Sequence, residues 1–434
     1  MYFAGNLCDF MKKISFLLPV LVLAIASCAK GEGSLPINNT GEVSYTIPLS
    51  DALTSLNSVL DGLNASQVAK STIPARIFSV ETFGRQRLPS TKADNLDYEL
   101  PDTLMYLVNF DLAEGGFAIL SGDTRLGESV YCVTENGEIH VEDFAEAFEF
   151  LHSPCTKSSD TDADSFRDIG EGFVPALLLS SMLADLKYGP VIAEEKTKAT
   201  AITTNSVLLE TKWTQWAPFN RYTFDSSGNQ CPAGCVAIAC AQIIQYCQKP
   251  ANPTFDGVAC SWADMATVYS YQHIDADHCT NSAKEQVARF LKHIGKKSLC
   301  YIRYHTDGSP GYADGVVRTL KNYNYSSVTK RTGFGSANQS RASTMLGQNR
   351  PVYLDGSDFH NGEGHAWVID GEWNGFFHCN WGWGGKWDGF YAKHNYFPIN
   401  SRAYYEQYID PGTTDPSLSG KDYDWNFRMI TYSY

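Results

Sequence analysis

Cys235 is the residue of this chain that is best placed to act as a nucleophile. It follows Gly234, and helix-forming residues continue from it without a break, so the pattern predicts a helix over residues 235–247. In the first turn of a helix, unpaired N–H groups and the positive end of the helix dipole favour a thiolate over a thiol. The small Gly234 would let a substrate backbone come close. A buried structural cysteine is the alternative, and this is the expected role of Cys240 and Cys247.

A nucleophilic cysteine needs a general base and a group that orients the base. His365 and Asn380 lie in two runs that are typical of strands, with polar and Gly-rich residues between them. A four-residue loop over 371–374 would place His365 directly opposite Asn380, about 5 Å away on one sheet face. A tight Asn-Gly turn at 374–375 would instead pair His365 with Gly384. We expect the first register, because it allows an imidazole–amide hydrogen bond.

Three other histidines are alternatives to His365 as the base. His378 is the main rival, because it precedes Asn380 by two residues and would share its strand face. It lacks the flanking Gly-His-Ala context of His365. The other two are His305 and His360.

Two tryptophans follow Asn380 in the run Asn-Trp-Gly-Trp-Gly-Gly. Trp381 and Trp383 could simply pack in the core. Beside Asn380 we expect them to shield the Asn–His hydrogen bond from water, which strengthens it. This role is better supported for Trp381. The glycines between and after them are expected to shape the backbone at the substrate cleft.

These motifs together resemble the streptopain-type cysteine peptidases, a branch of the papain-like clan. The resemblance rests on Gly-Cys-Val-Ala with Ala-Gln-Ile, on Gly-His-Ala-x-Val-Ile-Asp-Gly, and on Asn-Trp-Gly-Trp-Gly-Gly, in this order. It implies that Cys235 is the nucleophile, His365 the base and Asn380 the orienting residue. It also implies an oxyanion-hole glutamine in a Tyr-Asn-Gln-x-x-Pro-Tyr-Asn-like setting. Residues 213–220 match this setting and give Gln215.

The resemblance and the element pattern predict an α+β fold. A papain-like catalytic domain, with a helical lobe and an antiparallel sheet lobe, would follow an α+β propeptide domain. Helical spacing predicts helices over 51–60, 174–187 (amphipathic), 283–294 and 312–323. Strands are expected at 75–82, 104–111, 116–121, 130–133, 350–355 and 388–392. The predicted divisions are a signal peptide (1–28), a flexible tether (29–43), an inhibitory propeptide domain (44–198) and the catalytic domain (199–434).

The N-terminus has the features of an export signal. Two lysines precede the apolar stretch 14–25, which is too short to span a bilayer comfortably. The stretch ends on Ile-Ala-Ser-Cys, which resembles a bacterial lipobox and predicts a lipid anchor on Cys28. Ordinary signal cleavage is the alternative. The expected location is therefore outside the cell or in the bacterial cell envelope, with an outer-membrane lipoprotein as one form. A lipid on Cys28 would be the sole membrane contact.

Composition and spacing exclude several other functions. The net charge of −14 argues against a nucleic-acid partner. Cys231 and Cys235 have a C-x₃-C spacing, but no second Cys/His pair completes a zinc site. We therefore expect no metal and no cofactor. Disulfides are permitted in an exported protein, and their pairing stays open.

The sequence therefore predicts a secreted or lipid-anchored cysteine endopeptidase that is made as a zymogen. Its partners would be protein or peptide substrates and its own propeptide, which would act as inhibitor. The resemblance also implies a hydrophobic residue in the second substrate position before the cut. The charged stretch 194–200 has the composition of a protease-sensitive linker. Two rivals remain open, an acyltransferase or transglutaminase-like enzyme and a non-catalytic surface binding protein with a peptidase fold.

Overall fold

The computed structural model describes residues 44–69, 72–73, 76–88, 96, 98–152, 167–190, 204–270, 274–358, 363–396 and 425–434. The described residues from 46 to 434 belong to one compact unit. The predicted signal peptide, Cys28, the tether, the linker 194–200 and His360 lie outside the described residues.

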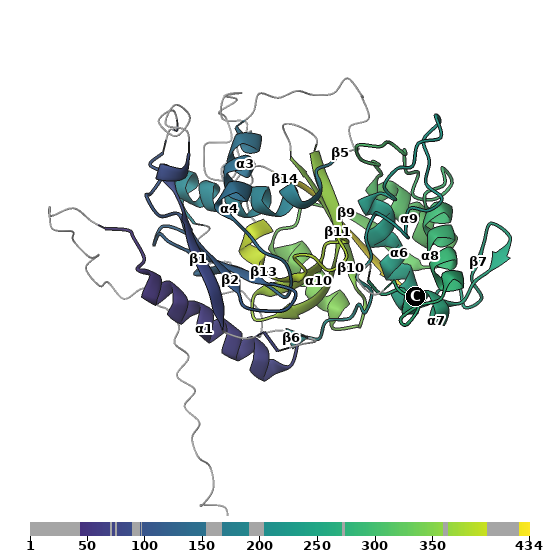
Figure 1. The fold of residues 1–434 in the computed structure, drawn as a ribbon, viewed down its shortest axis with the longest axis horizontal. Helices are drawn as coiled ribbons and strands as arrows, with labels where there is room; N and C mark the ends of the chain where they lie inside the picture. Colours follow the sequence, from purple (N-terminus) through teal and green to yellow (C-terminus); the bar gives the residue numbers. More distant parts are fainter. Residues whose placement is uncertain are drawn as a thin grey trace, which may run out of the picture. The chain divides into compact units, whose positions relative to one another are not determined.

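The described part of residues 46–434 is an α+β structure, as predicted (Figure 1). Its helices are α1 (Leu49–Ser66), α3 (Val141–Leu151), α4 (Phe173–Tyr188), α6 (Cys235–Cys247), α7 (Trp262–Thr267), α8 (Asn281–Ile294), α9 (Ala313–Asn322) and α10 (Ser336–Leu346). Its longer strands are β1 (Ile77–Phe83), β2 (Met105–Phe110), β3 (Phe117–Ser121), β4 (Val130–Thr134), β9 (Ser326–Thr332), β10 (Val352–Asp358), β11 (Glu363–Trp373), β12 (Phe376–Asn380), β13 (Gly389–Ala392) and β14 (Trp425–Ser433).

One sheet runs through both predicted domains, in the order β1-β2-β3-β4-β13-β12-β11-β10-β14-β9. The strands on this path pair antiparallel, and two short strands, β5 (Arg167–Asp168) and β6 (Thr204–Asn205), add to β11. The predicted domains are joined by the β4–β13 ladder, which pairs Val133 with Phe390, and by the short β5–β11 ladder. Strands of the predicted propeptide and of the predicted catalytic domain therefore share backbone hydrogen bonds.

Strands β2, β3 and β4 are buried on both faces. Along β2, Met105 and Leu107 belong to the main core, while Tyr106 and Val108 belong to a second cluster that includes the buried face of α1. Alternate strand residues point to opposite faces, so helices on both sides bury the whole strand.

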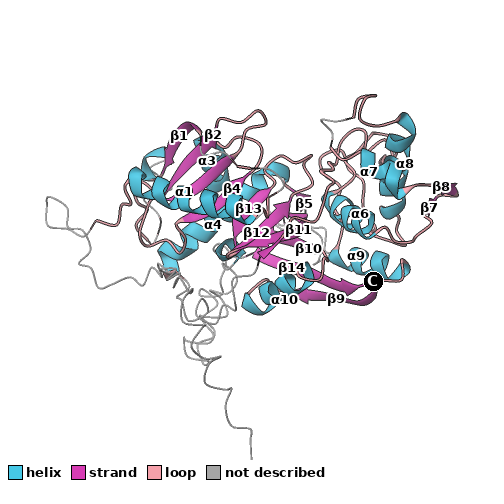
Figure 2. Ribbon diagram, turned by 90° about the horizontal axis from the view of Figure 1, so that it is seen from below, coloured by secondary structure: helices cyan, strands magenta, loops and turns pink. Residues whose placement is uncertain are grey.

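Helices α6, α7, α8 and α9 gather beside the catalytic strands (Figure 2). Helix α6 packs against α8 and α9 and against β10 and β11, so it is buried on nearly all sides. This agrees with the predicted helical lobe and sheet lobe. The predicted bounds of α6 are confirmed.

The prediction of an amphipathic helix over 174–187 is wrong in one respect. Helix α4 is present, but its residues are buried on every side as far as Asp185. Helix α3 and the short 3₁₀ segment η4 (Lys393–Tyr396) pack against it. The indole of Trp425 also donates to the hydroxyl of Ser180. Helix α4 is therefore covered by α3 of the predicted propeptide and by residues of the predicted catalytic domain.

Candidate active site

Cys235 is the first residue of α6, and backbone geometry fixes its position. The preceding Gly234 has φ 91°, a conformation that residues with a side chain rarely adopt. A Cβ on Gly234 would also lie 2.8 Å from the carbonyl oxygen of Ser309. The Ser309 hydroxyl donates to the carbonyl of Pro232 at 2.7 Å. Gly234 is therefore required by the packing of its own loop, a reason that the sequence did not reveal.

Gln215 lies beside this loop. Its backbone carbonyl accepts a hydrogen bond from the N–H of Ala233 at 2.9 Å, and its side chain is largely buried. The candidate oxyanion-hole residue and the candidate nucleophile are thus held together two residues before Cys235. The next residue, Trp216, is 58% exposed.

His365 lies on β11 and is completely buried. Its Nε2 is 2.7 Å from the carbonyl oxygen of Trp381. A carbonyl can only accept a hydrogen bond, so Nε2 carries a proton. In the neutral ring, Nδ1 is then the nitrogen that can take up a proton. This is the arrangement that a general base requires.

The expected direct pairing of His365 with Asn380 is wrong. The hairpin turns at Asn374 and Gly375, both with positive φ, and Asn380 pairs with Val368. The hairpin therefore has the tight Asn-Gly turn that was the alternative prediction, and an irregularity at Asp370 then shifts the register by one residue. The Asp370 carboxylate accepts from the N–H of Leu209 at 3.0 Å, which holds this residue out of the regular ladder.

Asn380 still reaches His365, but through the backbone. Its Oδ1 accepts from the N–H of Gly382 at 3.2 Å, and its Nδ2 donates to the carbonyl of Thr211 at 2.8 Å. The N–H of Gly382 and the carbonyl of Trp381 belong to the same peptide group. Asn380 therefore holds the peptide whose carbonyl binds His365. Oδ1 also accepts from Nε2 of Gln242 at 2.9 Å.

Asp388 is a member of this network that the sequence reading missed. Its Oδ1 accepts from the N–H of Trp381 at 2.9 Å. Burial raises the pKa of Asp388 to about 7, although the charges of Lys212 and His378 oppose the shift and that of Asp370 adds to it. A signal was present in the sequence, because an acidic residue follows a Gly- and Trp-rich loop directly before a buried strand.

Aromatic rings enclose His365. The ring centroid of Trp383 is 4.5 Å from that of His365, and the ring of Trp381 is 6.3 Å away. The ring of Trp367 lies parallel to the imidazole at 6.5 Å. These rings exclude water from the hydrogen bond of His365, which strengthens it. The bond that they surround is to the Trp381 carbonyl and not to the Asn380 side chain.

The rival histidine His378 has a different partner. Its Nδ1 is 2.6 Å from Asp370 Oδ1, and its Nε2 lies 3.8 Å from Glu135 of the predicted propeptide. Burial lowers the pKa of His378, but the charges of Asp370 and Glu135 outweigh this effect, so the net shift is upward. His305 lies on an exposed loop.

The nine described cysteines form no disulfide with one another. Within the same described ranges, no group of three or more His, Cys, Asp or Glu side chains is arranged to hold a metal ion.

The raised pKa of Asp388 predicts a pH-dependent stability. A carboxyl whose pKa rises on folding stabilises the fold at low pH, and this contribution is lost as the pH rises from the unfolded pKa of about 3.9 towards the folded value. Asn at this position can still accept from Trp381 but does not titrate. We expect Asp388→Asn to gain stability relative to the parent by roughly 2–4 kcal/mol between about pH 4 and pH 8.

Urea unfolding of the full-length chain at several pH values measures this difference. A Cys235→Ala background prevents self-cleavage during the measurement. A stability difference that does not change with pH would contradict the assignment.

Comparison with known proteins finds a family match for the segment that contains the candidate site. Residues 213–391 match the model of the Peptidase C10 family. Streptopain from Streptococcus pyogenes is 29% identical over 326 residues, which cover 68% of this chain and 75% of streptopain. The thiol protease/hemagglutinin PrtT of Porphyromonas gingivalis is 29% identical over 194 residues, 41% of this chain and 22% of that protein.

Among solved structures, a fragment of prointerpain A from Prevotella intermedia is similar, with a TM-score of 0.49 and 20% identity over 77% of this chain and 97% of that one. The segment matched by the family model contains Cys235, His365 and Asn380. This segment of the chain therefore matches the Peptidase C10 family, and the chain as a whole is similar to streptopain over 68% of its length.

Proposed function

We propose that this protein is a cysteine endopeptidase made as a zymogen, with residues 44–198 as inhibitory propeptide and residues 199–434 as catalytic domain. The observation that carries the proposal is the 2.7 Å hydrogen bond from His365 to the Trp381 carbonyl. It leaves Nδ1 as the basic nitrogen. The loop that supplies the carbonyl lies against the first turn of α6, where a Cβ on Gly382 would be 3.0 Å from Ile238.

The chemistry follows from these groups. His365 takes the proton of Cys235, which gives a thiolate and an imidazolium. The thiolate attacks the peptide carbonyl, and the N–H of Cys235 with the amide of Gln215 stabilises the oxyanion. The imidazolium then protonates the leaving amine. Water, deprotonated by His365, hydrolyses the thioester and regenerates the thiol.

The predicted propeptide covers His365, which supports latency. Phe173, the first residue of α4, is fully buried, with its ring centroid 5.7 Å from that of His365. The same ring lies 5.2 Å from Trp367 and 4.9 Å from Trp425. A substrate that approaches His365 from this side would have to displace Phe173.

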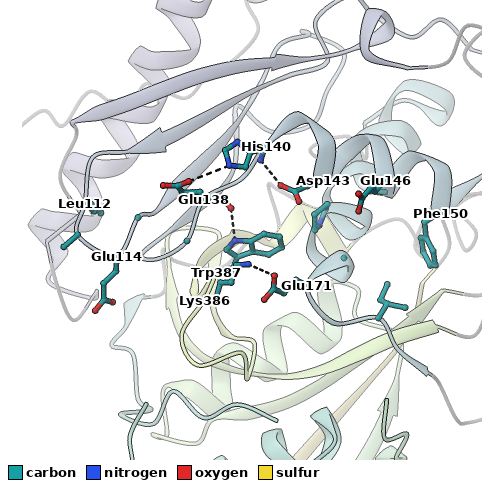
Figure 3. A pocket seen from close by; sticks show the side chains of 17 residues that line it. Leu112, Glu114, Glu138, His140, Asp143, Glu146, Phe150, Glu171, Lys386 and Trp387 are labelled. Carbon is teal, nitrogen blue, oxygen red and sulfur yellow. Dashed lines mark hydrogen bonds and ion pairs between the residues drawn. The ribbon is translucent and has the colours of Figure 1, made fainter. Parts of the chain in front are cut away.

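The predicted propeptide also contacts the tryptophan-containing loop, residues 381–388. Figure 3 shows Trp387 and Lys386 of this loop between propeptide groups. The indole of Trp387 donates to the carbonyl of Glu138 at 3.1 Å, and Lys386 forms an ion pair with Glu171. These residues line a cavity of about 850 Å³ at the junction.

Further contacts hold the propeptide after any single cut. The β4–β13 ladder joins the two parts by backbone hydrogen bonds. A buried pair joins His394 Nε2 to Asp185 Oδ2 at 2.8 Å. Cleavage of the linker alone therefore does not free the catalytic domain, and activation includes dissociation or further digestion of the propeptide.

The first prediction from the proposed function concerns the nucleophile. Cys235→Ala should fold but lose peptidase activity by roughly a thousandfold or more, because the variant lacks the proposed nucleophile. Asn380→Ala should retain more activity, because it positions a peptide and does not react. Peptide hydrolysis and labelling with a thiol-directed epoxide inhibitor measure both variants. Activity in pure Cys235→Ala would refute the assignment. If the wild type mainly transfers the acyl group to an added amine, the acyltransferase function is favoured. If the wild type is inactive and is not labelled, the non-catalytic binding protein is favoured.

The second prediction concerns latency. The full-length chain should be nearly inactive, and the wild type should cut itself between Ala193 and Val207. Full-length Cys235→Ala should stay intact until a trace of active enzyme is added, and its new N-terminus then locates the cut. Phe173→Ala should raise the activity of the intact chain, since it uncovers His365, whereas Phe78→Ala, at a 72% exposed residue, should not. A fully active intact wild type would contradict the zymogen.

The third prediction concerns the location. We propose export from a bacterial cell with a diacylglycerol anchor on Cys28. Within the described residues, no helix is long and apolar enough to cross a bilayer. Mass spectrometry of the cell-envelope fraction should find a lipid on Cys28, and Cys28→Ala should abolish it. A mature protein with an unmodified N-terminus would show that the lipobox pattern is coincidental.

A further inference from the structure

Gln242 is a buried residue that the proposed mechanism does not use. It lies on α6 two helical turns after Cys235 and is completely inaccessible to solvent. Both ends of its side-chain amide are occupied. Its Nε2 donates to Asn380 Oδ1 at 2.9 Å, and its Oε1 accepts from the N–H of Trp213 at 3.1 Å.

Backbone groups at the two ends fix the direction of this chain of amides. The N–H of Trp213 can only donate, so it faces the oxygen of Gln242 and turns Nε2 towards Asn380. The carbonyl of Thr211 can only accept, so it faces Nδ2 of Asn380. The oxygen of Asn380 is thereby directed at the N–H of Gly382. Flipping either amide would place two donors or two acceptors together.

This direction matters for His365, because the peptide of Gly382 carries the carbonyl that binds its Nε2. We propose that Gln242 is a positioning residue, which fixes the amide of Asn380 and through it the orientation of His365. The proposal rests on the proposed peptidase function. It also means that one side chain links the helix of Cys235, the strand of Asn380 and the segment that leads to Gln215.

The alternative is that Gln242 only stabilises the fold, as buried amides commonly do. The chain offers a matched control in Gln339 on α10, which is also buried. Its Nε2 donates to the carbonyls of Phe334 at 3.0 Å and Lys393 at 3.1 Å. Gln339→Met and Gln242→Met each remove buried hydrogen bonds with little change in side-chain length.

The test measures kcat, KM and thermal midpoint for these variants. Each is expressed full-length and activated by the same serine protease, which is then inhibited. We expect Gln242→Met to lower kcat roughly ten- to a hundredfold with KM within about twofold, because a small displacement of His365 slows the chemical step. Gln339→Met should lower the thermal midpoint but keep kcat within about twofold of wild type. Equal kcat in the two variants would overturn the proposal.

Gln242→Glu provides a test that does not depend on folding of the Met variant. Glu can accept from Trp213, but only its protonated form can donate to Asn380. Burial raises the pKa of a carboxyl, so the activity relative to wild type should rise about fivefold or more between about pH 8 and pH 5.5. Gln339→Glu should show no such rise. A flat ratio for Gln242→Glu overturns the positioning role.

These outcomes are separable from failure of the proposed function. If wild type is active, Cys235→Ala is inactive and Gln242→Glu follows the wild-type pH profile, the peptidase stands and the role of Gln242 falls. If wild type and Cys235→Ala are equally active or equally inactive, the proposed peptidase function and the positioning role of Gln242 are both refuted.

Discussion

The hydrogen bond between His365 Nε2 and the carbonyl of Trp381 is the interaction on which the site depends. A carbonyl is a fixed acceptor, so it selects the ring tautomer without any charge of its own. The backbone that carries it is held from two sides, by Asp388 at the N–H of Trp381 and by Asn380 at the next N–H. Gly382, at φ 75°, allows the backbone to turn between these anchors.

In this arrangement, His365 is oriented by the backbone of a loop and not directly by a side chain. The loop is in turn held by the surrounding protein, since the N–H of Gly384 donates to the carbonyl of Trp213 at 3.0 Å. The stacked rings of Trp381 and Trp383 fill the space beside the imidazole. Residues of the predicted propeptide bind the same loop at Trp387 and contact His365 through Phe173, so the proposed latency and the orientation of His365 would involve the same few residues.

The parts of the site that depend on local sequence could be predicted, and those that depend on distant contacts could not. Helix α6 was predicted with its bounds, because helix formers follow a glycine without interruption. The hairpin register was not predicted. The irregularity at Asp370 depends on a hydrogen bond from the N–H of Leu209, which is 161 residues away in the sequence. The role of Asp388 and the hydrogen bond from Gln242 to Asn380 also depend on how the folded chain buries these residues together. Helix α4 was predicted to be amphipathic because the sequence does not reveal that it packs against both α3 and the C-terminal part of the chain.

The shared sheet would give the proposed proteolytic maturation a cost in solubility. Removal of residues 44–198 would leave β13 as an open edge, with the backbone groups that pair with β4 facing water. The apolar side chains that α1 and β2–β4 bury, among them Trp373, Phe376 and Phe390, would become accessible at the same time. An unpaired strand beside an apolar surface is a template for pairing with another chain. In the full-length chain, residues 44–198 cover this edge, and their removal would expose it to self-association.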